Sequence, residues 1–267
     1  MARNKSAKGL FLLLRYIFIS GFMIMFSISG YAQTKIRVAV AASLMLPLEE
    51  VKKEYEKENP GIHIELIGGS SGNLTTQIKN GAPFHIFLSA NWAYPQELFN
   101  QGFSTQNPQV ITNGKMAIWT KSEITLIELS DFLLNGKAKA ITIANPQLAP
   151  YGWTAKKWLE QNGIWEKVKG QIIYGQSISQ VNQYIYSGNV EIAFTAVSAA
   201  NAEKLKGIGN WLIIEDENFL VPNGGIILKS DGRNNSKTTA SFFNFLLENT
   251  AVNIFQQYGY THNGEPK

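Results

Sequence analysis

The sequence predicts an α/β fold in which parallel strands are wound with helices, and two observations lead to this prediction. Apolar runs of strand length alternate with amphipathic segments of helix length from residue 36 to residue 90. A second alternation begins near Gly114 and is long enough to form a lobe of its own. By length alone, the stretch from residue 33 to residue 267 could form one domain or two.

The first strand is predicted over residues 36–42, IRVAVAA, because a nearly continuous apolar run is typical of a parallel strand covered on both faces. A helix is predicted over residues 46–58, and Pro47 suits its first turn. Ser43 therefore lies at the point where the first strand passes into the first helix.

The second strand is predicted over residues 61–67, and a helix opens at about Asn73. Between them lies the turn Gly68-Gly69-Ser70-Ser71-Gly72, in which Gly allows close approach and Ser offers hydroxyl donors. Such a turn aims backbone N–H groups at an anion, although most strand-to-helix turns contain Gly and Ser merely as helix caps. Ser43 and Ser71 thus both follow a strand, at the edge where open α/β sheets bind ligands.

The later elements are predicted from the same patterns. Further strands are expected over residues 84–89, 116–120, 140–145, 171–175, 190–196, 211–216 and 224–230. Further helices are expected over residues 73–80, 126–134, 153–162, 178–187 and 236–257. Ser177, followed by Gln180 three residues later, predicts a capping box at the start of one of these helices. Trp153, Trp158 and Trp165 are expected to pack against helices rather than form a ligand cage.

The first 32 residues differ from the rest of the chain. Basic residues precede or flank an apolar stretch, Gly9 to Ile28, and Ser29-Gly30-Tyr31-Ala32 supplies small residues for cleavage. This order predicts a signal peptide over residues 1–32, cut near Ala32, and a periplasmic location. A retained transmembrane anchor is the alternative, because the apolar stretch approaches spanning length.

Removing the signal peptide would change the charge of the chain. Four of the 24 Lys and Arg residues precede residue 34, and none of the 20 Asp and Glu residues do, which leaves 20 of each sign. A balanced chain lacks the basic footprint of a nucleic-acid-binding protein. The three His residues are scattered without metal-ligand spacing, so we predict neither a metal site nor a cofactor.

Several blocks of the sequence are similar to those of the periplasmic molybdate-binding proteins of ABC importers. The blocks are VAVAASLMLPLEEVKKEYEKENPGI, GGSSGNLTTQIKNGAPFHIFLSA, YPQELFNQG, ANPQLAPYGWTAKKWLEQNGIW, GQSISQVNQYIYSGNVEIAFTAVS and FQQYGY. The resemblance implies a two-lobed periplasmic-binding-protein fold of type II, with a mainly parallel sheet in each lobe and two hinge crossings. It places lobe one at residues 35–113 plus 214–267 and lobe two at residues 114–213.

The resemblance also implies a function. The protein is expected to be a monomer that binds molybdate, or tungstate, and delivers it to the permease and ATPase of an ABC importer. A binding protein for another tetrahedral oxyanion such as sulfate, a sensory protein, or an enzyme on the same fold are the alternatives. Ser43 and Ser71 have no partner His or Lys in their motifs, which argues against the enzyme.

Molybdate is a tetrahedral dianion without a proton at neutral pH, so its site needs hydrogen-bond donors only. Neutral donors at helix N-termini meet this need. The family's ligands fall on Ser43 and Ser71, each through its hydroxyl and backbone N–H, and on the backbone N–H groups of Tyr151 and Ile178 in lobe two.

The chain departs from the family's pattern at several positions. Some members place a Tyr hydroxyl donor at the position of Ala196, and Tyr151 could compensate through its ring or hydroxyl. His85 and Asn91 stand where Asp is usual, and we interpret His85 as structural. Ser70, one residue from Ser71 on the same turn, is expected to have little part in binding.

Overall fold

The computed structural model describes residues 34–121, 123–202, 205, 207–229 and 236–262. The predicted signal peptide, residues 1–32, lies outside the described residues. Within those ranges no helix is both long and apolar enough to cross a membrane.

The first sheet has the strand order β2-β1-β3-β10-β4. β1 pairs in parallel with β2 and β3, whereas β10 runs antiparallel to both of its neighbours, β3 and β4. Four of the five strands therefore point the same way, as the prediction of a mainly parallel sheet requires. The strands span Thr34–Ala41 (β1), Ile62–Gly69 (β2), Ile86–Ser89 (β3), Gln109–Gly114 (β4) and Val221–Ile227 (β10).

The second sheet repeats this plan with the order β7-β6-β8-β5-β9. β6 is parallel to β7 and β8, and only β5 is reversed, because it is antiparallel to both β8 and β9. The strands span Met116–Thr120 (β5), Ile141–Ala144 (β6), Ile172–Gly175 (β7), Ile192–Ala196 (β8) and Asn210–Ile213 (β9). The two-lobed α/β prediction is confirmed.

Two segments connect the sheets, as predicted. The chain leaves the first sheet at Gly114, the last residue of β4, and enters the second at Met116. It returns between Ile213 and Val221 through a short 3-10 helix, η5 (Glu217–Phe219). The predicted lobe boundaries lie between residues 113 and 114 and between residues 213 and 214. Both are next to the observed crossings, and the exact boundaries stay a prediction.

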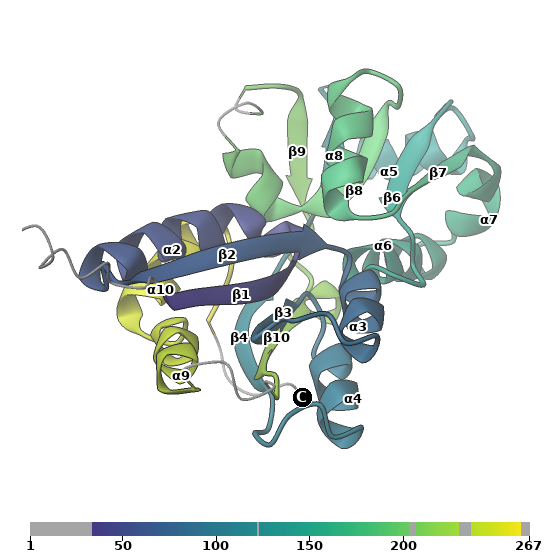
Figure 1. The fold of residues 1–267 in the computed structure, drawn as a ribbon. Coiled ribbons are helices and arrows are strands. Elements are labelled where there is room, and N and C mark those ends of the chain that lie inside the picture. Colours follow the sequence, from purple (N-terminus) through teal and green to yellow (C-terminus); the bar gives the residue numbers. More distant parts are fainter. Residues whose placement is uncertain (1–33, 122, 203–204, 206, 230–235, 263–267) are drawn as a thin grey trace, which may run out of the picture. The chain divides into compact units, whose positions relative to one another are not determined.

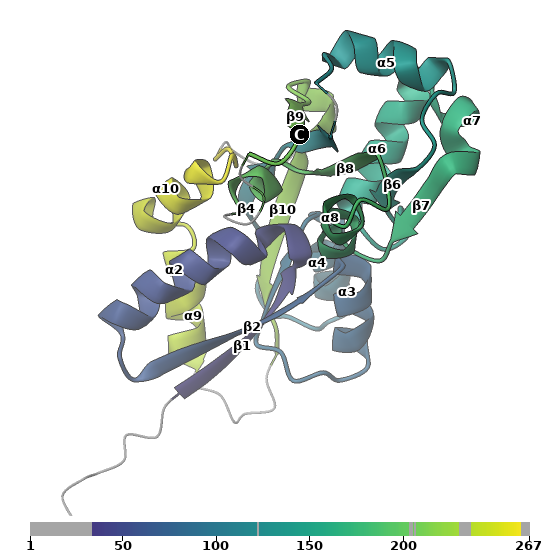
Figure 2. The same ribbon diagram turned by 90° about the horizontal axis from the view of Figure 1, so that it is seen from above.

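Helices cover both faces of the first sheet (Figures 1 and 2). α2, α9 and α10 lie on one face and α3 and α4 on the other. Residues of β1 alternate accordingly: Val38 and Val40 pack in the same cluster as Leu48 of α2, and Ala39 packs in the other, with Leu74 of α3. The helices span Met45–Glu58 (α2), Ser71–Lys79 (α3), Ala93–Asn100 (α4), Ser236–Phe245 (α9) and Asn249–Gln257 (α10).

The second sheet is flanked by α6 and α8, which both contact β6 and β8. Trp158 of α6 is buried as predicted, but Trp153 is 55% exposed, so the packing prediction was wrong for that residue. The elements of this lobe are α5 (Leu126–Leu134), α6 (Pro150–Gln161), α7 (Trp165–Val168), α8 (Ile178–Tyr186) and the 3-10 helices η2 (Lys169–Gln171) and η3 (Val197–Asn201).

The predicted helix over residues 236–257 was wrong in one respect, because it is two helices. The chain becomes extended at Glu248, which is the N-cap of α10. The break lets Phe242 of α9 and Phe255 of α10 both reach the core. The structure also contains α4 and β4, which were not predicted from the sequence.

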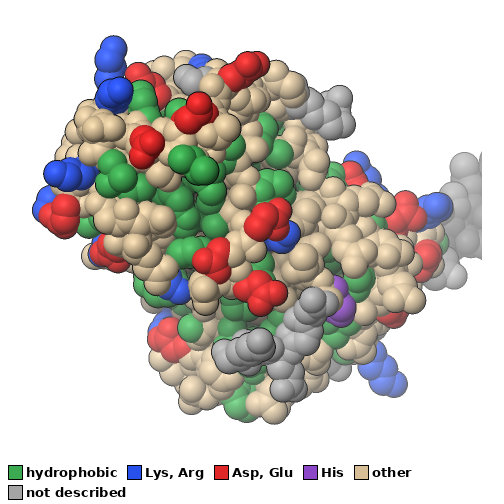
Figure 3. Space-filling view, turned by 180° about the vertical axis from the view of Figure 1, so that it is seen from behind, with side chains coloured by type: hydrophobic (Ala, Val, Ile, Leu, Met, Phe, Trp, Pro, Cys, Tyr) green, Lys and Arg blue, Asp and Glu red, His purple; other side chains and the backbone are tan. Residues whose placement is uncertain are grey.

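One face of the described part of the molecule carries charged side chains of both signs. On the face drawn in Figure 3, acidic and basic groups lie among one another rather than in separate fields. Ion pairs such as Lys35 with Glu65 (2.9 Å) and Lys156 with Glu160 (3.3 Å) follow the same pattern. This face therefore offers no basic patch.

Candidate functional site

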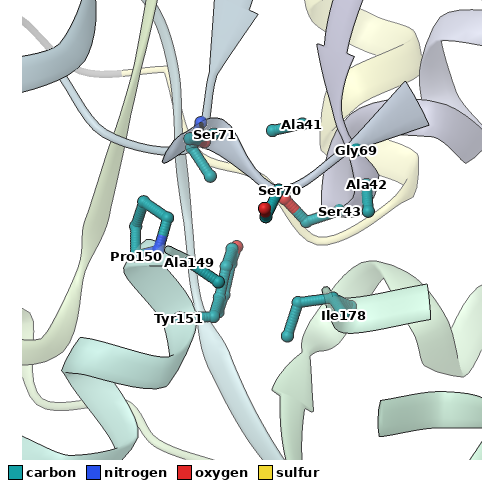
Figure 4. A pocket seen from close by; sticks show the side chains of 11 residues that line it. Ala41, Ala42, Ser43, Gly69, Ser70, Ser71, Ala149, Pro150, Tyr151 and Ile178 are labelled. Carbon is teal, nitrogen blue, oxygen red and sulfur yellow. Dashed lines mark hydrogen bonds between the residues drawn. The ribbon is translucent and has the colours of Figure 1, made fainter. Parts of the chain in front are cut away.

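A small pocket lies where the strand ends of the first sheet meet the helix starts of the second lobe. Its cavity volume is about 10 Å³, so it is a tight site and not one for a drug-sized ligand. Figure 4 shows the serines of lobe one on one side and Tyr151 and Ile178 on the other. The pocket is lined by Ala41, Ala42, Ser43, Gly69, Ser70, Ser71, Ala90, Ala149, Pro150, Tyr151 and Ile178.

The structure brings all four sequence-predicted site residues into this pocket. Ser43 lies in the 3-10 turn η1 (Ala42–Leu44) that leads into α2, and Ser71 is the first residue of α3. Tyr151 follows Pro150 at the start of α6, and Ile178 is the first residue of α8. A helix N-terminus carries positive partial charge, so the starts of α3, α6 and α8 bring such charge to this pocket.

Ser43 has a free hydroxyl and a firmly held backbone. Its side chain is 4% exposed, and the Oγ atom has no hydrogen-bond partner. Its carbonyl oxygen accepts from the Tyr260 hydroxyl at 2.6 Å and from Ser198 Oγ at 2.9 Å. Because Ser198 follows β8 of the second sheet, this residue of lobe one is bonded directly to lobe two.

Ser71 is held in a different way. Its Oγ accepts a hydrogen bond from the backbone N–H of Ala90, at 3.1 Å, and it is 1% exposed. An acceptor hydroxyl keeps its own proton for another partner. Next to it, the backbone N–H of Gly72 donates to the carbonyl of Leu148 in lobe two at 2.8 Å. Ser71 thus has a hydroxyl proton to donate and a backbone fixed from both lobes.

Tyr151 forms a wall of the pocket and is 2% exposed. Burial raises the pKa of its phenol well above the ordinary value, and the neighbouring Tyr260 adds to the shift, so the group is neutral. The hydroxyl has no hydrogen-bond partner and lies under Gly114, where a Cβ atom would come within 2.0 Å of it. Gly114 therefore leaves room for this ring beneath the first hinge crossing.

The capping box predicted at the start of α8 was wrong. Ser177 is the N-cap residue, but its side chain makes no capping hydrogen bond. The Gln180 side chain instead accepts from the backbone N–H of Gln176, at 2.7 Å. Consequently, the Ser177 hydroxyl accepts no hydrogen bond from the backbone N–H groups in the first turn of α8. Ile178 belongs to this turn.

No residue that lines the pocket carries a charged side chain. Within the described part of the chain there is also no group of three or more His, Cys, Asp or Glu residues arranged to hold a metal ion. The pocket can therefore donate hydrogen bonds to a small anion, but its lining offers no general base and no charge-bearing nucleophile.

The positions that depart from the family's pattern lie outside the pocket. Ala196 ends β8, is fully buried and does not line the pocket. His85 Nδ1 accepts from the backbone N–H of Arg37 at 2.9 Å, which confirms its structural interpretation. Asn91 accepts through its side chain from the N–H of Ala93 and so orders the start of α4.

Two residues that support the site were not found from the sequence, Ser198 and Tyr260. They reach the Ser43 carbonyl from 155 and 217 residues away. No local pattern signals such contacts, because they join residues that are far apart in the sequence.

Comparisons with known proteins agree with this architecture. Residues 36–261 match the family described as bacterial extracellular solute-binding protein. The chain belongs to this family. Among related solute-binding proteins, the molybdate-binding protein ModA of Azotobacter vinelandii is 30% identical over 85% of this chain and 89% of its own length. ModA of Rhodobacter capsulatus is 26% identical over 86% of this chain and 89% of its own length.

Solved structures of solute-binding proteins are similar as well. The periplasmic molybdate-binding protein of Azotobacter vinelandii superposes with a TM-score of 0.78 at 26% identity, covering 86% of this chain and all of that one. The sulfate-binding protein SubI of Mycobacterium tuberculosis has a TM-score of 0.67 at 13% identity, over 85% and 86% of the two chains, which shows a shared fold alone.

Proposed function

We propose that this solute-binding protein binds molybdate in the pocket between its lobes and delivers it to an ABC importer in the periplasm. The observation that carries the proposal is the convergence of three helix N-termini and serine hydroxyls in a pocket with no charged lining residue. Its similarity over most of its length to proteins named molybdate-binding supports the choice of ion.

In this proposal Ser43 and Ser71 donate their hydroxyl and backbone N–H groups from lobe one. Tyr151 and Ile178 donate backbone N–H groups from lobe two. Each helix N-terminus contributes about half a unit of positive charge, so three of them offset much of a dianion's charge without a Lys or Arg. Such a ligand would join the two lobes.

The absence of a carboxylate from the lining favours an unprotonated anion. Phosphate carries a proton near neutral pH and needs an acceptor in its site, whereas molybdate and tungstate do not. We therefore propose that tungstate binds as well, and that no metal cation or cofactor takes part.

Isothermal titration calorimetry of the purified protein with molybdate, tungstate, sulfate and phosphate tests the proposal. We expect tight binding of molybdate and tungstate, much weaker binding of sulfate and none of phosphate. The affinity should not change when a chelator is added. Tight sulfate binding without molybdate binding would assign the protein to another oxyanion, and a requirement for a divalent cation would contradict the site.

A further inference from the structure

Ser70 has an unusual position for the N-cap residue of a helix. An N-cap serine ordinarily accepts a hydrogen bond from the second or third N–H of its helix. Here the Ser70 side chain makes no such bond. The second N–H of α3, that of Gly72, donates instead to Leu148 of lobe two at 2.8 Å. The hydroxyl of Ser70 therefore does not make the capping hydrogen bond that is usual at this position.

This hydroxyl is buried in the pocket. Ser70 is 4% exposed and lines the pocket, and its Oγ has no hydrogen-bond partner. In Figure 4 its side chain is drawn between those of Ser71 and Ser43. A buried hydroxyl without a partner costs free energy and calls for an explanation, such as a ligand that satisfies it.

The unpartnered buried groups of the protein concentrate at this site. Among the described residues, five buried side-chain atoms lack a partner, and three of them belong to pocket-lining residues: Ser43, Ser70 and Tyr151. A small ligand with several acceptor oxygens would satisfy the free hydroxyls of Ser43 and Ser70 together.

We infer that Ser70 donates its hydroxyl proton directly to the bound oxyanion, as a third serine beside Ser43 and Ser71. This inference rests on the proposed function and reverses the expectation from the sequence that Ser70 has little part in binding. Ser70 would thus add a side-chain donor from lobe one. In lobe two, Ala196 has no donor side chain.

Replacing Ser70 separates a ligand contact from a structural role. We expect Ser70→Ala to weaken the binding of molybdate by about ten- to hundred-fold, because a hydrogen bond to a charged group is lost. The midpoint of thermal unfolding without ligand should not fall, since the hydroxyl has no partner in the protein. Ser70→Gly should behave in the same way, because Gly is tolerated at N-cap positions.

Ser104→Ala is the matched control. Ser104 is 5% exposed and lies outside the pocket, and its hydroxyl both donates to the Gln106 carbonyl and accepts from the Gln106 N–H at 3.0 Å. This variant should lose thermal stability and keep the affinity of the unmodified protein, which is the opposite pattern.

The measurements are calorimetric titration with molybdate and tungstate, and thermal unfolding without ligand. If the unmodified protein binds molybdate and both Ser70 variants bind it equally well, the inference fails while the proposed function stands. If both variants lose stability but not affinity, Ser70 is a structural cap and the inference fails as well. If the unmodified protein binds neither ion, the proposed function and the inference fall together.

Discussion

At the scale of single residues, Ser43 and Ser71 hold their hydroxyls in different ways. The Ser43 hydroxyl has no partner in the protein, whereas that of Ser71 accepts from the N–H of Ala90. The same substitution should therefore have different effects on folding at the two positions, although both hydroxyls are proposed to contact the same ion.

Ser43→Ala and Ser71→Ala should each weaken molybdate binding by about 1.5–3 kcal/mol, roughly ten- to hundred-fold, since each removes one charge-assisted hydrogen bond. Ser43→Ala should leave the free energy of unfolding nearly unchanged. Ser71→Ala should lower it by about 1–3 kcal/mol, because the buried N–H of Ala90 loses its acceptor. Calorimetry and chemical denaturation measure the two quantities. Unchanged affinity in both variants would show that the proposed site is wrong.

At the scale of elements, the position of α6 depends on close contact with β6. A Cβ atom on Gly152 would lie 2.0 Å from the carbonyl oxygen of Ala144, the last residue of that strand. Pro150 occupies the first turn of the helix, which suits its fixed φ angle. Together these residues bring the start of α6, and with it Tyr151, close to the sheet.

Gly152→Ala should consequently push α6 away from β6. We expect a loss of about 1–3 kcal/mol in the free energy of unfolding, typical of overpacking, and weaker molybdate binding because the N–H of Tyr151 moves with the helix. Gly170→Ala is the control, since nothing lies within 4 Å of its Cβ position. Thermal unfolding and titration check both effects. Equal stability of the two variants would contradict the close contact.

The same elements show how far the sequence could predict the site. The strand over residues 116–120 and the helix over residues 126–134 have the predicted bounds, because their periodicity is local and strong. The residues Ser43 and Ser71 were found because a turn between a strand and a helix has a local signature. The role of Ser177 was mistaken, since Gln180 bonds to Gln176. The free hydroxyl of Ser70 could not be predicted either, because it depends on Leu148 of the other lobe.

At the scale of the whole molecule, Tyr260 connects the C-terminal segment to the site. Burial raises its pKa to about 12, while hydrogen bonds with Ser198 and Ser43 oppose that shift. An unfolded tyrosine titrates near pH 10. Between these values the folded protein keeps a proton that the unfolded chain has released, so stability is complete below pH 10 and is lost as the pH rises towards 12.

Tyr260 should thus account for a loss of about 2–3 kcal/mol in the free energy of unfolding between pH 10 and 12. The variant Tyr260→Phe should be less stable at neutral pH by about 1 kcal/mol, through the lost hydrogen bond to Ser43. Above pH 10 its stability should decline less steeply than that of the unmodified protein. Denaturation curves measured across this range test the difference, and parallel declines would exclude Tyr260 as the source.

The proposed site divides its donors unequally between side chains and backbone, and this has an evolutionary consequence. A single point mutation can remove a serine hydroxyl. The side-chain donors of lobe one can therefore be lost by substitution. The N–H groups of Tyr151 and Ile178 belong to the backbone, which every residue type except proline retains. Lineages can therefore exchange those two side chains, provided that the helix starts stay in place, without giving up the donors themselves.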